Sequence, residues 1–577
     1  MRNDYPRPTL KREEKTYKLL NGEWLFCDGN IENDELLFDP SKYPEKIIVP
    51  FVPESKASGI GRYTRGDEIC YMRDIELSEQ ELSGRVMFRI GAVDYYCEAF
   101  VNGNLAGPHS GGYVPCEFDI TEFVHSGKNT LVLRVADHTW SELQPSGKQC
   151  ESDKLRGCVY TRCTGIWQTA WLEFLPTTYI DDIFCKPNLP ESRVDIEVLL
   201  CGDEDDGIDV EVEVSYKGDP VARKACTSTD GTASLSIPIK DPVLWDIGRG
   251  ELYDVTVKAG KDTAATYFGM RSVGCDGKKV MLNGRSVFMR MLLDQGYNPD
   301  GIYTALDPED FKKDIKRMQD AGFNGARMHM KIFEPGYIRA ADEAGFLLWG
   351  EYPNWGLELE KFESTDVFAP EWTAEILRDR NCPSIIGWCP FNEMDTGRNA
   401  EIMFVARSIT RSLDPTRLYI DASGWTHRGG GDIYDVHDYE QDPEVLRERY
   451  AVIDEDAYVN NLDWDNGLYD GKMPYFISEF GGAGFDLDSE KVARFDNDNP
   501  ETEWGYGEAP KSAEELFERF KAQCEVFLDH PDICGFCYTQ FCDVMQEING
   551  IYTFDRRPKF DVSRAKAVLC RKAAIED

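Results

Sequence analysis

The chain has 577 residues, too many for one hydrophobic core, and this length predicts about two to four domains. Its formal net charge of -40 excludes the basic surfaces that nucleic acids and anionic membranes require, so neither is an expected partner. No apolar run reaches membrane-spanning length, and residues 1–20 lack the apolar stretch of a signal peptide. The 18 cysteines have irregular spacings, which without an export signal predicts reduced thiols and a cytoplasmic protein.

Residues 1–175 are dominated by β-strand patterns. Arg85–Ile90 and Thr130–Val135 are rich in β-branched and aromatic or aliphatic residues, and Asn102-Gly103 is a turn signal. These features predict an all-β sandwich, and they point to no chemistry by themselves.

Residues 176–275 form a second β segment. Val194–Leu199 and Val210–Val214 alternate apolar and polar residues, which predicts one buried and one solvated face. The length is typical of an immunoglobulin-like sandwich, and no catalytic pattern lies within it.

From residue 276 the pattern changes to alternating strands and helices. Asp307-Pro308 predicts a helix start, with Phe311, Ile315 and Met318 on one face and Gly322 at the end. The expected strands are Ser286–Leu293, Phe323–His329, Phe346–Glu351, Ser384–Asn392, Thr416–Asp421, Asp432–His437, Pro474–Glu479 and Ile533–Gln540. Such a series predicts a (β/α)₈ barrel over residues 276–577.

Two glutamates follow buried strands of this series. Ser384–Asp395 is an apolar run that ends in Asn392-Glu393, and Pro474–Gly482 is an apolar run that ends in Glu479. In a (β/α)₈ barrel the chemistry lies at the carboxyl ends of the strands, so both carboxylates are expected at the barrel mouth. Two facing carboxylates are what glycosidic bond cleavage requires.

Several stretches resemble glycoside hydrolase family 2, the β-galactosidase and β-glucuronidase family. They are Thr164–Glu173, Phe391–Glu393, Ile477–Gly481 and Asn549–Tyr552. The resemblance implies a multidomain β and α/β protein: a jelly-roll sugar-binding-like domain over 1–175, an immunoglobulin-like sandwich over 176–275 and a catalytic TIM barrel over 276–577.

The same resemblance implies roles for individual residues. Glu393 would be the general acid/base and Glu479 the nucleophile of a retaining reaction. Asn392 would hydrogen-bond the sugar 2-hydroxyl, Arg327 would hold the nucleophile ionised, and Tyr439 would orient it. A structural ion pair is the alternative for Arg327, and an ordinary loop aromatic is the alternative for Tyr439.

Further polar and aromatic residues fall at or just after the expected strand ends, where they could line a sugar site. They are Asp294, Gln295, His329, Glu351, Tyr352, Trp355, His437, Tyr538 and Gln540. Asp294, His437 and Trp355 are the strongest candidates for substrate contact, and the alternative for each of the nine is a residue that only fills the rim.

No metal or cofactor is expected. Where related β-galactosidases carry an Asn-Arg-His-Glu stretch, this chain has Leu292–Tyr297, which puts magnesium ligation there in doubt. Asp463–Gly467 begins like a calcium loop but has Pro474 at the twelfth position. Cys534 and Cys537 lie in an apolar strand and are interpreted as core residues.

The glycone is predicted from residues 547–550. Related β-glucuronidases bind the sugar carboxylate with Asn-x-Lys-Gly, whereas this chain has Glu547 and Asn549 at the Asn and Lys positions. A glutamate would repel a uronate, so both residues are expected to meet a neutral sugar. Lys331, Arg339 or Arg556 could restore uronate binding from elsewhere.

The sequence therefore predicts a retaining exo-β-glycosidase with a β-glycoside as its partner, and β-galactosidase is the expected activity. The alternatives are a β-hexuronidase (β-glucuronidase or β-galacturonidase), a non-catalytic carbohydrate-binding protein on the same scaffold, and a β-mannosidase or transglycosylase. Because similar enzymes often associate, a homo-oligomer is a further expectation.

Overall fold

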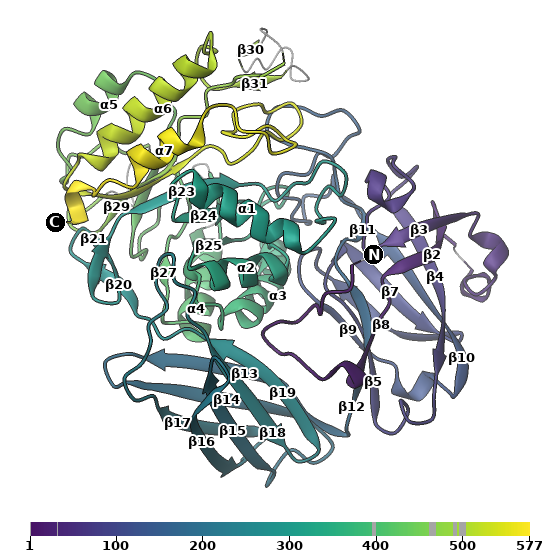
Figure 1. Cartoon of the computed structure of the whole chain (residues 1–577). Helices are drawn as coiled ribbons and strands as arrows, with labels where there is room; N and C mark the ends of the chain where they lie inside the picture. The colour runs from purple at the N-terminus through teal and green to yellow at the C-terminus, as the bar shows by residue number, and fades with distance from the viewer. Residues whose placement is uncertain are drawn as a thin grey trace.

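The computed structural model describes residues 2–31, 33–394, 400–460, 469–488, 493–494 and 503–576. Two β domains and a larger α/β domain lie side by side (Figure 1), with the first β domain at the right, the second below and the α/β domain at the upper left. The expectation of two sandwiches followed by a barrel domain is confirmed. The calcium-like stretch Asp463–Gly467 lies outside the described residues.

The first domain is a sandwich with sheets in the order β3-β2-β4-β10-β7-β8 and β1-β12-β5-β9, and the short pair β11-β6 lies beside them. Its strands are β1 (Tyr17–Leu19), β2 (Gly22–Cys27), β3 (Glu45–Val49), β4 (Glu68–Leu77), β5 (Arg85–Ile90), β6 (Val93–Asp94), β7 (Tyr96–Val101), β8 (Asn104–Ser110), β9 (Cys116–Asp119), β10 (Gly127–Ala136), β11 (Gly165–Ile166) and β12 (Ala170–Leu175). Between β10 and β11 the chain makes a long excursion, residues 137–164, which reaches the third domain.

The second domain packs the sheet β13-β14-β17 against β16-β15-β18-β19. Its strands are β13 (Thr178–Asn188), β14 (Arg193–Gly202), β15 (Asp209–Tyr216), β16 (Asp219–Thr227), β17 (Thr232–Pro238), β18 (Tyr253–Ala259) and β19 (Asp262–Phe268). The alternating pattern of β15 buries Val210, Val212 and Val214 completely, which explains why this segment forms one wall of a sandwich core.

The third domain is built on eight parallel strands in the order β27-β26-β25-β24-β23-β32-β29-β28. They are β23 (Met289–Asp294), β24 (Gly325–Met328), β25 (Leu347–Glu351), β26 (Ile385–Cys389), β27 (Leu418–Tyr419), β28 (Tyr434–Asp438), β29 (Tyr475–Phe480) and β32 (Ile533–Tyr538). The edges β27 and β28 meet where the Asp432 amide donates to the Tyr419 carbonyl at 2.8 Å. All eight expected strands are present, and the sheet curls into a barrel.

Helices cover the outside of this barrel (Figure 1). They are α1 (Glu309–Asp320), α2 (Pro335–Ala344), α3 (Glu363–Asp379), α4 (Ala400–Leu413), α5 (Pro443–Arg449), α6 (Ala513–Leu528) and α7 (Val562–Leu569). Phe311, Ile315 and Met318 are the buried residues of α1, as the helical spacing predicted. The helix begins at Glu309, whose amide donates to the Asp307 carboxylate at 2.9 Å. Two short sheets complete the domain: β20 (Val273–Asp276), β21 (Lys279–Leu282) and β22 (Arg285–Val287), and β30 (Ala493–Arg494) with β31 (Trp504–Gly505).

No helix of the described residues is long and apolar enough to cross a membrane. Cys534 and Cys537 are both buried in β32, as the apolar strand pattern predicted.

Candidate active site

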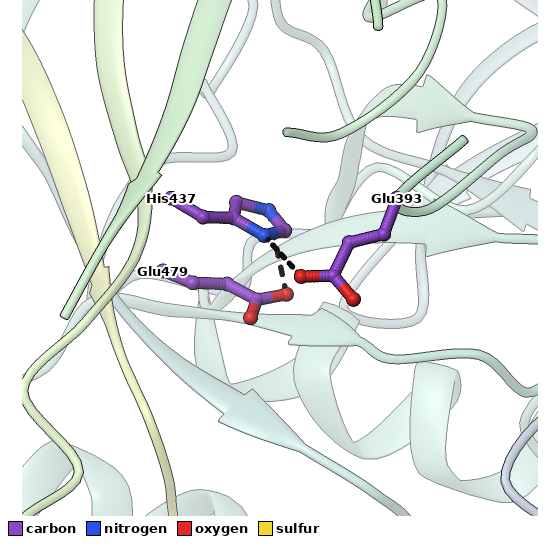
Figure 2. Close-up of side chains that lie close together, drawn as sticks. All are labelled: Glu393, His437 and Glu479. Atoms are coloured by element: carbon purple, nitrogen blue, oxygen red, sulfur yellow. Dashed lines mark hydrogen bonds and ion pairs between the residues drawn. The ribbon is translucent and has the colours of Figure 1, made fainter. Parts of the chain in front are cut away.

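Glu393 and Glu479 come together at the carboxyl ends of their strands. Glu479 lies near the end of β29, and Glu393 follows β26 with its amide donating to the Ser423 carbonyl at 2.8 Å. Carboxylate oxygens of the two glutamates and a ring nitrogen of His437 all lie within 4.8 Å of one another (Figure 2). We call Glu393, His437 and Glu479 the catalytic cluster.

The surroundings of Glu479 hold its carboxylate ionised. Arg327 Nη1 donates to Oε1 at 3.2 Å, and the Tyr439 hydroxyl donates to Oε2 at 2.5 Å. Burial by itself would raise the pKa of Glu479, but the charges of His437 and Arg327 and the Tyr439 hydrogen bond lower it to about 2. An ionised carboxylate fixed by two donors suits a nucleophile.

Arg327 connects Glu479 to Glu351 and Asn392. From β24 it donates through Nε to Glu351 Oε1 at 2.5 Å and through Nη2 to Asn392 Oδ1 at 3.2 Å. His329 Nδ1 lies 3.1 Å from the other oxygen of Glu351. Burial and the charge of Lys148 hold the pKa of His329 well below its ordinary value, so this ring is neutral at neutral pH.

Glu393 is less enclosed than Glu479, with side chains 15% and 7% exposed respectively. His437 Nδ1 is its hydrogen-bond partner at 2.9 Å. Ser423 Oγ donates to Asp435 at 2.8 Å and is also 3.0 Å from His437 Nε2. Because the serine proton points at Asp435, Nε2 must donate to Ser423, which leaves Nδ1 and Glu393 to share one proton.

Asn392 is fixed through its backbone. Its amide donates to Asn354 Oδ1 at 2.8 Å, and its carbonyl accepts from Trp355 Nε1 at 3.3 Å. Asn392 Nδ2 is buried and has no hydrogen-bond acceptor among the described residues. This amide is therefore free to donate to a hydroxyl group of a bound ligand.

The excursion between β10 and β11 supplies part of the barrel mouth. Within residues 144–163, which we call the jelly-roll loop, the Ser146 amide donates to the Trp355 carbonyl at 2.7 Å. The Lys148 ammonium lies 3.8 Å from the centre of the Trp355 ring. Further along, the Gly157 carbonyl accepts from Gln546 Nε2 at 2.7 Å. The loop thus contacts both the segment that follows β25 and the segment that follows β32, which are far apart in the sequence.

Three residues predicted to bind substrate form hydrogen bonds with one another. Glu547 accepts from the Tyr160 hydroxyl and, at 2.8 Å, from Asn549 Nδ2, while Gln540 Nε2 donates to Asn549 Oδ1 at 2.8 Å. Glu547, Asn549 and Gln540 are 2%, 0% and 0% exposed. Both oxygens of Glu547 are therefore engaged by the protein, and it does not face the sugar as an open carboxylate.

Asp294 and Tyr538 are not brought to the cluster. Asp294 accepts from the Gly296 amide and the Tyr337 hydroxyl, both at 2.9 Å, and Tyr538 packs edge-on against Phe480. Buried parallel strands carry side chains on two covered faces, so a position near a strand end does not reveal which face a residue occupies. The expectation that Asp294 contacts substrate among the first is not supported by its location.

The three cations named as alternative uronate ligands are also occupied elsewhere. Lys331 Nζ donates to the Gly296 carbonyl at 2.7 Å, Arg339 pairs with Glu343 at 2.8 Å, and Arg556 donates to the Tyr297 carbonyl at 2.9 Å. None of them has a contact with the catalytic cluster in the described part of the chain.

The residues present do not fit a divalent cation. At the stretch that matches the magnesium ligands of related β-galactosidases, each Asp294 oxygen already accepts a hydrogen bond. In the described residues, the catalytic cluster alone has ligand-like spacing, but Arg327 lies 3.2 Å from Glu479 and would repel a cation there.

A groove of about 830 Å³ adjoins the cluster. Its lining includes Tyr439 and Tyr506, whose rings stack with centroids 3.5 Å apart and planes inclined by 9°. The Tyr439 hydroxyl connects this groove to the carboxylate of Glu479.

Three family models match successive parts of the chain. They describe the sugar-binding domain of glycosyl hydrolases family 2 (residues 32–176), glycosyl hydrolases family 2 (178–271) and the TIM barrel domain of the same family (273–480). The chain belongs to glycosyl hydrolases family 2. The resemblance drawn from the sequence is therefore confirmed.

Family 2 relatives of known name differ in substrate. The chain is 26% identical over 429 residues to a Formosa agariphila protein named "Putative beta-glucuronidase", covering 70% of this chain and 50% of that protein. It is 24% identical over 470 residues to a beta-galactosidase of Leuconostoc mesenteroides, covering 76% and 42% respectively. The chain thus spans about half the length of the curated relatives it matches.

The fold of this family 2 chain is similar over its whole length to that of a solved enzyme. A beta-glucuronidase of Bifidobacterium dentium, solved with coumarin-3-O-glucuronide, superposes with a TM-score of 0.81 at 18% identity, covering 96% of this chain and 97% of that chain. At this identity the likeness establishes the fold.

Sequence reasoning missed three residues at the site: Lys148, Ser423 and Tyr506. Ser423 follows an expected strand, which was a usable signal. Lys148 and Tyr506 lie on segments without strand or helix periodicity, and only the folded chain brings them to the barrel mouth.

Proposed function

We propose that the chain is a retaining exo-β-glycosidase. The observation that carries this proposal is the distance of at most 4.8 Å between carboxylate oxygens of Glu393 and Glu479. Retaining enzymes hold their carboxyl groups about 5–5.5 Å apart, whereas inverting enzymes need about 6.5–9.5 Å to admit a water molecule. The different environments of the two carboxylates support different roles for them.

In the first step Glu479 attacks the anomeric carbon while Glu393 donates its proton to the leaving oxygen. The bond to the aglycone breaks, and an ester forms between Glu479 and the sugar. In the second step Glu393 removes a proton from water, which attacks the anomeric carbon and releases Glu479 with the β-configuration retained. His437 shares the proton of Glu393 at 2.9 Å, and Asn392 Nδ2 would donate to the sugar 2-hydroxyl.

The jelly-roll loop supports action on terminal sugars. Its contacts with Trp355 and Gln546 place polypeptide over the barrel mouth, which would obstruct a chain continuing past the bound sugar. Tyr439 and the adjoining groove leave room for the aglycone on another side.

The sequence predicts β-galactosidase activity because an open carboxylate at Glu547 would repel a uronate. Glu547 accepts from Tyr160 and Asn549, so it repels a uronate less than an open carboxylate would. A β-hexuronidase is the second candidate, and Lys148 is the observation that favours it.

The non-catalytic alternative is tested by a panel of nitrophenyl β-glycosides. We expect turnover of at least one sugar and a loss of about 10⁴-fold or more in kcat for Glu479→Ala, because the covalent nucleophile is removed. Added azide should restore turnover of the variant and give a glycosyl azide of inverted configuration. Near-normal activity of Glu479→Ala, with circular dichroism showing an intact fold, would contradict the proposal.

A further inference from the structure

The jelly-roll loop carries a buried cation to the barrel mouth. Lys148 is 6% exposed, and its ammonium lies over the Trp355 ring, whose indole nitrogen donates to the Asn392 carbonyl. In the described part of the chain, no carboxylate lies within ion-pair distance of Lys148 Nζ, and no hydrogen-bond acceptor contacts it. The aromatic ring is its one direct partner.

Other buried lysines of this chain are satisfied by the protein. Lys331 Nζ donates to carbonyl groups at 2.7 and 2.9 Å, and Lys559 Nζ pairs with Asp543 at 2.6 Å. An ammonium in a buried side chain without such partners gives up hydration that a cation–π contact only partly replaces. Because none of the described residues supplies such a partner to Lys148, we look for it in a bound ligand.

The electrostatic surroundings keep Lys148 charged and connect it to the catalytic cluster. Burial lowers the pKa of Lys148, but Cys158, Glu393 and Glu547 around it raise the pKa by more. The same ammonium lowers the pKa of His329, which is bonded to Glu351 inside the site. Lys148 thus belongs to the same electrostatic environment as the two catalytic glutamates.

We propose that Lys148 binds an anionic substituent of the sugar, a carboxylate or a sulfate ester, and so determines the charge preference of the enzyme. This inference rests on the exo-β-glycosidase function proposed above. It assigns the recognition of that group to the sugar-binding domain instead of the barrel, where residues 547–549 lack a cation. Burial raises the pKa of Glu547 and the charge of Lys148 lowers it, while Tyr160 and Asn549 donate to its two oxygens, so Glu547 opposes an anionic sugar less than an isolated carboxylate would.

The test compares sugars that differ only in the group at carbon 6. Nitrophenyl β-galacturonide, β-galactoside and 6-sulfo-β-galactoside form one set, and nitrophenyl β-glucuronide and β-glucoside form another. We expect kcat/KM for an anionic member to exceed that of its neutral counterpart at least tenfold, a gap of about 1.4 kcal/mol in transition-state binding. A higher kcat/KM for the uronide or for the sulfated sugar identifies which of the two anionic groups the enzyme recognises.

Lys148→Met removes the charge while retaining much of the side-chain volume, and Lys148→Arg retains the charge. We expect Lys148→Met to lower kcat/KM at least tenfold for the anionic sugar and less than threefold for the neutral one. Lys148→Arg should recover part of the kcat/KM for the anionic sugar. Lys154→Met, on an exposed residue of the same loop, is the matched control and should leave both values unchanged. The melting temperature of each variant checks folding.

Two results would overturn the assignment of Lys148. One is a preference for neutral sugars, and the other is a Lys148→Met preference equal to that of the wild type, whether or not both kcat/KM values fall. Turnover of neutral sugars with no uronide or sulfate activity overturns this inference alone, while the proposed glycosidase function stands. If no glycoside is hydrolysed, the proposed function fails, and calorimetric binding of free galacturonate, glucuronate, galactose 6-sulfate and galactose then decides the inference. Binding of an anion that depends on Lys148 supports it, and no such binding overturns it.

Discussion

The two sides of the active site differ in how far the protein satisfies their charges. On the barrel side, Arg327 bonds Glu351 and Glu479, and Tyr439 bonds Glu479, so each ionic group has a partner before substrate arrives. On the side of the jelly-roll loop, the face of Trp355 is the one contact of the Lys148 ammonium among the described residues. Under the two proposals above, the barrel side is organised in advance for bond cleavage, and the ligand completes the loop side.

The largest effect expected from the barrel side, after loss of the nucleophile, is that of Glu393→Ala. A general acid contributes about 10²–10⁴-fold, and only where the leaving oxygen needs its proton. We expect a loss in this range on nitrophenyl or alkyl glycosides and a much smaller loss on dinitrophenyl glycosides, measured as kcat/KM. Equal losses on both classes would mean that Glu393 is not the acid.

A smaller effect is expected when one donor to the nucleophile is removed. Tyr439→Phe deletes the 2.5 Å hydrogen bond to Glu479 and keeps the ring stacked on Tyr506. Hydrogen bonds to charged groups contribute about 1.5–3 kcal/mol, so kcat/KM should fall by about 10- to 100-fold. Tyr506→Phe keeps the same stack and removes a hydroxyl that does not bond Glu479. Its kcat/KM should therefore fall less than that of Tyr439→Phe. A larger loss in Tyr506→Phe than in Tyr439→Phe would contradict the role of Tyr439.

Sequence patterns located the two glutamates of the barrel side but none of the contacts of the loop side. Glu393 and Glu479 follow apolar runs typical of buried strands, and the carboxyl ends of the strands lie at one end of a barrel. The sequence does not show in which direction a side chain points at a strand end. Asp294 was therefore expected to contact substrate, whereas its carboxylate accepts a hydrogen bond from Tyr337. Lys148 was missed because a loop without periodicity reveals its contacts only through the fold.

Glu547 was also misjudged because its contacts appear only in the folded chain. Its position in the chain suggested a carboxylate facing the sugar, but Tyr160, a residue of the first domain, donates to it. Contacts between domains so distant in sequence leave no local pattern, so the sequence could not reveal that this charge was already compensated.

The smallest expected effect concerns stability and its dependence on pH. Burial lowers the pKa of His427, but Asp421 at 2.7 Å and the nearby Asp435 raise it to about 9, while the ring packs on Tyr434. A raised pKa gives stability that is fully present below the ordinary value of about 6.5 and is lost as pH rises through 9.

His427→Gln should therefore melt at a lower temperature than the wild type near pH 6, and the gap should close by pH 10. The shift in the pKa of His427 corresponds to at most about 3 kcal/mol in the free energy of unfolding. Scanning fluorimetry between pH 5 and 10 measures the gap, and a gap that is constant with pH would show that the ion pair with Asp421 is not its source.

The most direct test of the central claim is to trap the glycosyl-enzyme. A 2-deoxy-2-fluoro glycoside of the sugar that the panel selects, with a good leaving group, should slow the second step and let the intermediate accumulate. Mass spectrometry of the digested protein should then find the fluorosugar on the peptide that contains Glu479. A label on another residue, or a product of inverted configuration with no covalent intermediate, would contradict the account.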